Sequence, residues 1–300
     1  MNFNNECIKV ERRGPMIKTW LFIPGNNEKH LQKARILDVN ALIFDLEDAV
    51  SVSEKETARL KVSKIIQETK ENLNYIRIND RTTPFFLDDL YECVRDGLTG
   101  IVLPKVNTKE DIVIIDYLLE VLERKYQINN HKVSIIPIIE SASGLYHAYE
   151  IATASTRIQC LAFGAEDYKL DLNISPDHHG TELLYSKSKL VEVSSAAGIE
   201  PPIDSVFTDF QDEEGLVEDA RMGKRLGFQG KLLIHPNQID RTNQIYSPTP
   251  EEIEEAKKIV QQYNESLDKG EAAIQIDGKM VDIPVAERAR KLLLYADIQV

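Results

Sequence analysis

Short apolar runs alternate with longer segments of helical periodicity along most of this chain, and that alternation restricts its fold more than any other feature. Apolar runs of this length are typical of strands that are covered on both faces in a parallel sheet. We interpret as strands the runs TWLFIP, ALIFDL, NYIRIND, GIVLPKV, VSIIPIIE, CLAFGAED, the weaker segment 203–206 and GKLLIHP. Eight strand and helix units in about 230 residues predict an α/β fold, a parallel (β/α)₈ TIM barrel.

The segments between these runs carry the helical period. We expect helices at 28–37, 53–71, 84–94, 109–125, 141–153, 182–197 and 213–226. An open, doubly wound sheet is the competing arrangement. No glycine-rich fingerprint follows the first strand, and polar residues recur at the carboxyl end of nearly every strand. Both observations favour the barrel, which we assign to residues 17–246.

The last part of the chain departs from the repeating pattern. Residues 251–267 have helical periodicity, and Asp268-Lys269-Gly270 predicts a turn. The segment AAIQIDGKMVDIP predicts an irregular or β-like stretch, and a final helix runs to about Tyr295. We therefore expect residues 247–300 to form a C-terminal helical arm appended to the barrel.

Charge and composition exclude several classes of function. With a formal net charge of −13 and a pI near 5.0, the chain is repelled by nucleic acid and by anionic membranes. No apolar run approaches the roughly 20 residues of a membrane span, and the polar start MNFNNECIKVERRG lacks the apolar core of a signal peptide. Cys7, Cys93 and Cys160 lack the spacing of a zinc site or a disulfide framework. We expect a soluble protein of the reducing cytoplasm.

In a barrel of this type the active site forms at the carboxyl ends of the strands. Here those ends carry Asp45, Glu47, Asp48, Arg77, Asn79, Asp80, Lys105, Glu140, Glu166, Asp167 and His235. Acids outnumber basic groups in this set. The site is therefore expected at this end of the barrel, with several carboxylates facing few positive charges.

Glu140 and Asp167 form the most informative pair, because they follow adjacent strands and have small neighbours that leave room for an ion and its ligand. Such carboxylates suit Mg²⁺, which takes one or two of them and completes its shell with water and substrate oxygens. Buried paired acids also need a cation to offset their repulsion. The alternative is that each acid caps the helix that follows its strand. We favour the metal site.

Arg77 lies inside the apolar strand Tyr75-Ile76-Arg77-Ile78, where a guanidinium needs a partner. One interpretation is a structural ion pair with Asp45 or Glu47. The other is a bidentate clamp on a substrate carboxylate beside the metal. Asp45 and Asp48 are expected to support the loop, whereas Glu47 is placed to reach a metal-bound water.

Further basic residues are weaker candidates for ligand contacts. Lys105 follows Pro104 at a strand end and is either a phosphate or carboxylate contact or a solvated surface lysine. Lys55 lies in the first turn of a helix near the expected mouth and can meet a ligand phosphate. Arg59, on the same helix face, is expected to form exposed pairs with neighbouring glutamates. His235 is expected to be a hydrogen-bonded structural residue, and we give it only a binding role.

Motifs along nearly the whole chain, taken as an ordered set, carry a family resemblance. They are LFIPGNN, IFDLEDAVSVSEKETAR, RIND, VLPKV, IIESASGL, FGAEDY, GTELLY, LGFQGKLLIHPNQI and IDGKMVDIPVAERA. The set resembles the citrate lyase beta-subunit family of Mg²⁺-dependent acyl-CoA lyases in the HpcH/HpaI aldolase superfamily, which includes citramalyl-CoA and malyl-CoA lyases.

The resemblance implies a TIM barrel in which Glu140 and Asp167 hold Mg²⁺ and Arg77 clamps the carboxylate of a 2-oxo acid. It implies that Asp282, in the GKMVD motif of the arm, enters the active site of a neighbouring subunit as the general acid/base. Read from the residues alone, Asp282 is a loop acid or a cap for the last helix. A shared site requires at least a dimer, and the resemblance indicates a trimer or hexamer.

The implied reaction is cleavage of a 3-hydroxyacyl thioester, on CoA or on an acyl carrier, to an acetyl thioester and a 2-oxo acid. Citryl thioester and oxaloacetate are the leading pair, with other citrate lyase subunits as possible partners. A free-standing citramalyl-CoA or malyl-CoA lyase is the alternative enzyme. A non-catalytic subunit that binds acyl carriers is the alternative of another class.

Where relatives have an Arg-Ser pair, this chain has Lys18-Thr19-Trp20. We expect Lys18 to contact substrate and Trp20 to alter the mouth for the coenzyme arm.

Overall fold

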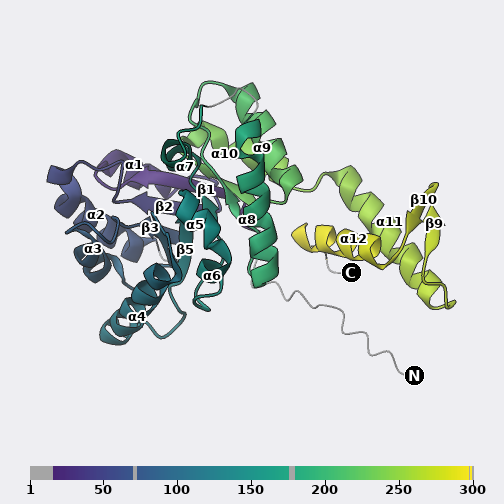
Figure 1. Cartoon of the computed structure of the whole chain (residues 1–300), viewed down its shortest axis with the longest axis horizontal. Coiled ribbons are helices and arrows are strands. Elements are labelled where there is room, and N and C mark those ends of the chain that lie inside the picture. The colour runs from purple at the N-terminus through teal and green to yellow at the C-terminus, as the bar shows by residue number, and fades with distance from the viewer. Residues whose placement is uncertain (1–15, 70–72, 176–179, 297, 299–300) are drawn as a thin grey trace. The chain divides into compact units, whose positions relative to one another are not determined.

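The computed structural model describes residues 16–69, 73–175, 180–296 and 298, and Figure 1 shows its elements. The chain divides into two compact units. One is formed by Ile17–Tyr246, and the other includes Ser247–Val300.

Eight parallel strands close into a barrel in the unit Ile17–Tyr246, which confirms the predicted TIM-barrel fold. The strands are β1 (Thr19–Pro24), β2 (Ala41–Asp45), β3 (Asn74–Arg77), β4 (Gly100–Leu103), β5 (Ser134–Ile139), β6 (Ala162–Phe163), β7 (Ile203–Asp204) and β8 (Gly230–Leu233). Each strand pairs with the next in chain order, and β8 returns to β1, where Thr19 lies opposite Lys231. Because all pairs are parallel, every strand has its carboxyl end on the same face of the barrel.

Helices follow the strands around the barrel (Figure 1). They are α1 (Glu28–Ala34), α2 (Lys55–Glu68), α3 (Phe86–Cys93), α4 (Lys109–Tyr126), α5 (Ala142–Tyr146), α6 (Ala148–Ala152), α7 (Ala165–Asp171), α8 (Leu184–Ala197), α9 (Glu213–Leu226) and α10 (Ile239–Tyr246). Short 3-10 turns occur at η1 (Val52–Glu54), η2 (Thr181–Leu183) and η3 (Pro236–Gln238). The helix expected at 141–153 is broken at His147, and α7 and α10 were not predicted.

Alternation along the strands separates two apolar cores. Side chains such as Trp20, Ile43 and Tyr75 form a small cluster with residues of β4 to β8, whereas their neighbours Leu21 and Phe44 join the larger cluster with the helices. This is the expected division of a closed barrel, in which successive side chains point to opposite faces of the sheet. The small cluster therefore fills the barrel interior.

Arg59 lies in a buried ion pair rather than in the exposed pairs expected for it. Its Nε donates to Asp89 Oδ1 at 2.9 Å, and its side chain is only 9% exposed. Asp89 Oδ2 also accepts from the backbone N–H and side-chain amide of Asn79, at 2.9 and 2.6 Å. Arg59 therefore joins α2 to α3 and to the loop after β3, a long-range contact that helix periodicity does not reveal.

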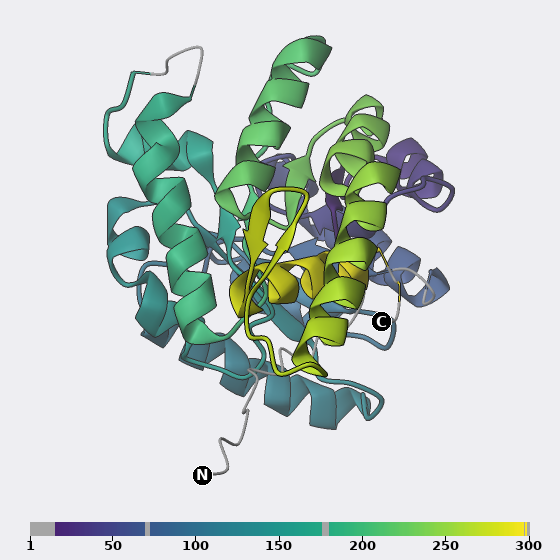
Figure 2. The ribbon, with the colours of Figure 1, turned by 90° about the vertical axis from the view of Figure 1, so that its right-hand side faces the viewer.

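The unit that includes Ser247–Val300 consists of α11 (Pro250–Leu267), β9 (Ile274–Ile276), β10 (Lys279–Val281) and α12 (Ile283–Tyr295). The two strands form an antiparallel hairpin, the yellow arrows in Figure 2. Its turn residues Asp277 and Gly278 have φ values of 48° and 80°, which suit a two-residue hairpin turn. The segment expected to be irregular or β-like is thus a regular hairpin.

In the described part of the chain, no helix has the length and apolar character needed to cross a membrane. Cys93 and Cys160 are buried and free, while Cys7 lies outside the described residues.

Candidate active site

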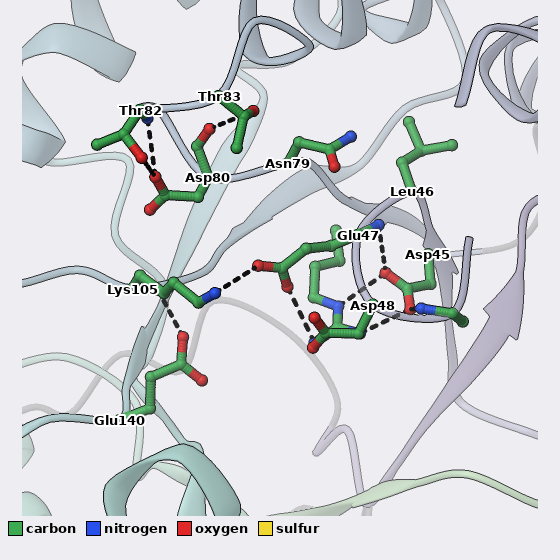
Figure 3. A network of polar contacts seen from close by, with 12 residues as sticks. Asp45, Leu46, Glu47, Asp48, Asn79, Asp80, Thr82, Thr83, Lys105 and Glu140 are labelled. Atoms are coloured by element: carbon green, nitrogen blue, oxygen red, sulfur yellow. Dashed lines mark hydrogen bonds and ion pairs between the residues drawn. The ribbon is translucent and has the colours of Figure 1, made fainter. Parts of the chain in front are cut away.

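Charged side chains from four neighbouring strand ends meet in one network, drawn in Figure 3. Asp45 is the last residue of β2, and Arg77 is the last residue of β3. Lys105 follows β4 after Pro104, and Glu140 follows β5 directly. The parallel sheet therefore brings these residues together at one end of the barrel.

Arg77 is oriented by Asp45. Its Nε and Nη2 donate to the two carboxylate oxygens of Asp45 at 2.8 and 2.6 Å. The guanidinium carbon lies 4.8 Å from the centre of the Phe22 ring. The remaining nitrogen, Nη1, lies 3.2 Å from Glu47 Oε2 and 3.1 Å from Asp48 Oδ2. The structural ion pair with Asp45 is therefore present, and Nη1 is the nitrogen that can turn to another anion.

Glu47 is buried within this network, with 7% of its surface exposed. Asp45 fixes its loop by accepting hydrogen bonds from the backbone N–H groups of Glu47 and Ala49, at 2.9 and 3.1 Å. Burial raises the pKa of Glu47 to about 7, although the positive charges of Arg77 and Lys105 favour its ionised form. Within the described ranges, Glu47 Oε1 has no hydrogen-bond partner. A buried oxygen of this kind marks a place where a ligand or water can bind.

Glu140 is the second buried carboxylate. Its Oε1 accepts a hydrogen bond from the backbone N–H of Lys105 at 2.6 Å. Burial raises the pKa of Glu140 to about 8 against the lowering effect of this hydrogen bond, and the charge of Asp167 adds to the rise. Gly164 leaves room for the side chain, because a Cβ atom at position 164 would lie 2.6 Å from the Cβ of Glu140.

Asp167 lies half-buried in the first turn of α7 rather than at the end of a strand. The sixth strand ends at Phe163, and Gly164 leads directly into the helix.

No group of three or more acidic, histidine or cysteine side chains is arranged to hold a metal ion within the part of the chain that the structure describes. The set of Glu140 and Asp167 nevertheless fits Mg²⁺, which takes one or two protein carboxylates and retains water or substrate oxygens. The buried Glu140, whose charge is costly without a cation, supports the same fit.

Lys55 is placed differently from the expected contact at the mouth. Its ammonium is buried and donates to the backbone carbonyls of Leu46 and Glu47 at 2.7 and 2.6 Å. Burial also lowers the pKa of Lys55. The side chain therefore supports the loop that carries Glu47, and two of its three donors are used there.

His235 lies at the carboxyl end of β8, on the expected face of the barrel. Its exposed ring stacks on Phe210, with centroids 5.1 Å apart and an interplanar angle of 18°. Its Nδ1 lies 2.7 Å from Asn237 Oδ1. The side chain is hydrogen-bonded, as expected, and still open to solvent.

The expected roles of Lys18 and Trp20 at the substrate mouth are wrong, because both residues lie at the amino end of β1. Trp20 pairs with Ala41, the first residue of β2, and its indole is fully buried. The ring lies 4.8 Å from that of Tyr75, inside the barrel. Lys18 precedes the strand, and the carboxylates lie at the strand's other end.

Asp282 belongs to the C-terminal unit, where it precedes α12. Its Oδ1 accepts a hydrogen bond from the backbone N–H of Val285 at 3.3 Å. The interpretation of Asp282 as a helix cap is therefore confirmed. Its role as an acid/base in a neighbouring subunit stays a prediction.

Two features of this site were not predicted. One is the backbone N–H of Lys105, because a main-chain donor leaves no trace in residue type. The other is that Gly164 makes room for the Glu140 side chain itself, whereas the small neighbours were expected to leave room for an ion and its ligand. A glycine between a strand and a helix that begins with acids was a usable signal for the second feature.

Comparison with known proteins identifies the family. A model of the HpcH/HpaI aldolase/citrate lyase family matches residues 18–236, and a model described as a C-C bond lyase of the TIM-barrel fold matches residues 186–298. The chain is 37% identical over 282 residues to citrate lyase subunit beta of Leuconostoc mesenteroides subsp. cremoris, covering 93% of each protein. It is 30% identical over 292 residues to mitochondrial citramalyl-CoA lyase of Rattus norvegicus, covering 92% of this chain and 85% of that one.

A similar solved structure is that of protein CitE from Mycobacterium tuberculosis in complex with magnesium, acetoacetate and coenzyme A. It is 27% identical, has a TM-score of 0.75, and the match covers 94% of this chain and 98% of that chain. Sequence, fold and the family models agree over most of the chain. The protein described here therefore belongs to the HpcH/HpaI aldolase/citrate lyase family and is a carbon–carbon lyase.

Proposed function

We propose that this chain is a Mg²⁺-dependent lyase that cleaves a citryl thioester to an acetyl thioester and oxaloacetate. The observation that carries the proposal is the pair formed by buried Glu140 and nearby Asp167 beside the oriented Arg77, in a chain 37% identical to a citrate lyase subunit beta. The CitE structure that contains magnesium and coenzyme A supports the cofactor and the thioester class of substrate.

In this proposal Glu140 and Asp167 hold Mg²⁺, with water and substrate oxygens as the other ligands. When bound, the ion supplies positive charge that stabilises the negative oxygen developing on the substrate. Glu140 is suited to this role because its burial leaves the carboxylate without a strong solvent shell, and a cation offsets the resulting cost.

Arg77 and Glu47 act on the substrate in this scheme. Nη1 of Arg77 binds the carboxylate of the oxo-acid portion and keeps the bond to be broken aligned. Glu47 Oε1 accepts a hydrogen bond from a substrate hydroxyl or from water, which gives this buried oxygen the partner that it lacks among the described residues. The substrate hydroxyl gives its proton to a general base, the carbon–carbon bond breaks to release the oxo acid, and a general acid returns a proton to the expelled thioester enolate. His235, on the same face, is a candidate contact for the thioester arm.

Asp282 of a neighbouring subunit is the acid that we propose for protonating the enolate. This assignment rests on the family resemblance of the GKMVD motif, and it requires an oligomer, which we expect to be a trimer or hexamer. The thioester is carried by CoA or by an acyl-carrier subunit, and other citrate lyase subunits are proposed partners in the cytoplasm.

A citramalyl-CoA lyase is the second candidate, favoured by the 30% identity to the citramalyl-CoA lyase of Rattus norvegicus. The two candidates share the chemistry and differ in the oxo acid that is released. Which candidate is correct therefore depends on the residues that line the site around the oxo acid.

The test is to incubate the purified protein and Mg²⁺ separately with citryl-CoA, a citryl-loaded acyl carrier, (S)-citramalyl-CoA and malyl-CoA. Oxaloacetate, pyruvate and glyoxylate are then measured. We expect oxaloacetate from a citryl thioester, and none from the Glu140→Gln variant under the same conditions. Pyruvate without oxaloacetate would replace the first candidate with the second, and no oxo acid from any substrate would remove both.

A further inference from the structure

Lys105 has a backbone conformation that its place in the fold does not explain. Its φ is 53°, in the left-handed region that non-glycine residues seldom adopt. Three other described non-glycine residues have positive φ, and all lie where a helix ends or in the hairpin turn: Gln127, Asn173 and Asp277. Lys105 instead follows a barrel strand, within the candidate active site. A costly conformation at such a position points to a local task.

The backbone task concerns Glu140. With this conformation the N–H of Lys105 donates to Glu140 Oε1 at 2.6 Å. Glu140 is confined on another side by Gly164, which leaves no room for a Cβ atom. The carboxylate is therefore fixed by a main-chain donor from the loop after β4 and by the close approach of the chain after β6.

The side-chain task concerns Glu47. Figure 3 shows Lys105 between Glu47 and Glu140, with its ammonium directed toward Glu47. Nζ lies 3.6 Å from Glu47 Oε1, the oxygen that has no hydrogen-bond partner among the described residues. At this distance the ammonium neutralises the buried charge without occupying the oxygen, which stays open to substrate or water.

We propose that Lys105 is a positioning residue that acts through both of its ends: its backbone N–H orients Glu140, and its ammonium holds Glu47. This role replaces the phosphate or carboxylate contact that the sequence suggested for Lys105. The kinetic part of the inference rests on the proposed function, whereas the backbone part concerns Glu140 with or without turnover.

The backbone task is tested with two variants that both lack the ammonium. Lys105→Gly adopts the left-handed conformation freely, whereas Lys105→Val resists it because valine is β-branched. Mg²⁺ affinity of the full-length protein, measured by isothermal titration calorimetry without substrate, should be about tenfold weaker for Lys105→Val than for Lys105→Gly. Metal-free crystal structures should show the hydrogen bond to Glu140 in the glycine variant and its loss in the valine variant.

Equal affinities, or an unchanged hydrogen bond in both crystal structures, would overturn the backbone part. A wild-type protein that binds no Mg²⁺ would count against the proposed function instead. The crystal structures would still decide whether residue 105 orients Glu140.

The side-chain task is tested with Lys105→Gln and Lys105→Arg, which keep most of the side chain's length. With citryl-CoA, Lys105→Gln should lower kcat about tenfold and leave KM within about twofold, because the ammonium acts through Glu47. Lys105→Arg should recover most of kcat, since it restores the positive charge. A rise in KM with kcat unchanged would show that Lys105 binds substrate directly, and the inference would then be wrong. Thermal unfolding of both variants checks that they are folded.

Discussion

At the scale of single residues, the proposed function divides the donors of Arg77 between structure and substrate. Two nitrogens are fixed on Asp45, whose carboxylate also holds the backbone of Glu47 and Ala49. The third nitrogen, Nη1, faces Glu47 and Asp48. Its direction is therefore set before a substrate arrives, which reduces the side-chain entropy that binding would otherwise cost.

Replacing Arg77 with lysine tests this division. Lysine keeps the positive charge, but one ammonium cannot span both oxygens of Asp45 and also reach a substrate carboxylate. We expect kcat/KM for citryl-CoA to fall by about 100-fold in steady-state assays. Arg241→Lys is the matched control, because Arg241 forms an exposed ion pair with Glu213. A value for Arg77→Lys within about threefold of wild type would show that charge alone suffices.

The two raised carboxyl pKa values predict how Mg²⁺ and pH act together. The pKa values of Glu47, about 7, and Glu140, about 8, exceed their ordinary value of 4.5. The folded, metal-free protein therefore holds protons that the unfolded chain has released, and its stability should fall as pH rises from about 5 to 8. In the proposed function Mg²⁺ binds the ionised form of Glu140, so the stabilisation that it provides should grow over the same range.

Differential scanning calorimetry with and without saturating Mg²⁺, between about pH 6 and 8, measures this effect. The increase in Tm caused by the metal should be largest at the highest pH. Glu140→Gln removes one titrating group and should reduce both the increase and its pH dependence. An increase that is the same at every pH would contradict the proposed coupling.

Residue type and strand direction are enough to predict which charged residues gather at the carboxyl end of the barrel. Glu47, Arg77 and Glu140 follow from that rule, because parallel strands end on one face. The partners of each group do not follow, since they depend on side-chain directions and on the backbone of Lys105. The substrate contact expected for Lys18 is wrong by the same rule, because Lys18 precedes its strand and therefore lies at the opposite end of the barrel.

At the scale of elements, β7 depends on side-chain contacts because it has only two residues, Ile203 and Asp204. Asp204 is fully buried, and its Oδ1 lies 3.0 Å from Lys187 Nζ of α8. Lys231 of β8 donates to the carbonyl of Ser205 at 2.7 Å and forms an ion pair with Asp219 of α9. This buried charge network joins β7 to its neighbouring strand and to both helices that cover it.

Removing the carboxylate of Asp204 should therefore destabilise the barrel strongly. Asp204→Ala leaves Lys187 and Lys231 with Asp219 as the remaining acid of the network. Loss of one partner from a buried ion pair costs about 3–5 kcal/mol. Urea unfolding followed by circular dichroism should show a loss of this size.

Glu213→Ala is the control for the network, because its ion pair with Arg241 is exposed. Exposed pairs contribute about 0–1 kcal/mol. If Asp204→Ala were as stable as this control, the network would not be what secures β7.

Element prediction succeeded where periodicity extends over many residues, as in α4 and the helix at 213–226. It failed where a few contacts decide. The break at His147 carries neither proline nor glycine, and α7 begins immediately after Gly164, so that Asp167 lies on a helix and not on a strand. Tertiary packing, rather than local preference, sets such boundaries.

At the scale of the whole molecule, the C-terminal unit has its own small cores. Ala256, Val260 and Leu293 pack between α11 and α12, and Tyr263 packs with Ile276 of the hairpin. The cap of α12 by Asp282 belongs to this unit. If Asp282 serves another subunit, as proposed, the arm that carries it must be ordered by its own contacts.

The proposed sharing of Asp282 is tested by mixing two inactive proteins. Asp282→Asn should abolish turnover but keep the helix cap, because asparagine is also a good N-cap residue. Glu140→Gln should be inactive for lack of a metal ligand. Co-expressed as mixed oligomers, the two variants should regain citryl-CoA cleavage, because some sites combine an intact Glu140 with an intact Asp282.

Each variant alone and co-expressed wild type are the controls for this assay. Asp282→Ala should lose both turnover and the cap, and α12 should then be less stable. A mixture that stays inactive while wild-type oligomers turn over would remove the shared site.

The left-handed backbone of Lys105 also has a consequence for protein engineering and for sequence drift. A screen for thermal stability alone should favour glycine at this position, since glycine adopts that conformation without strain. The same change deletes the ammonium beside Glu47. With the proposed role of Lys105, selection for heat resistance favours glycine at residue 105, whereas selection for turnover favours lysine. A stabilised variant of this lyase is therefore best sought with lysine kept at that position.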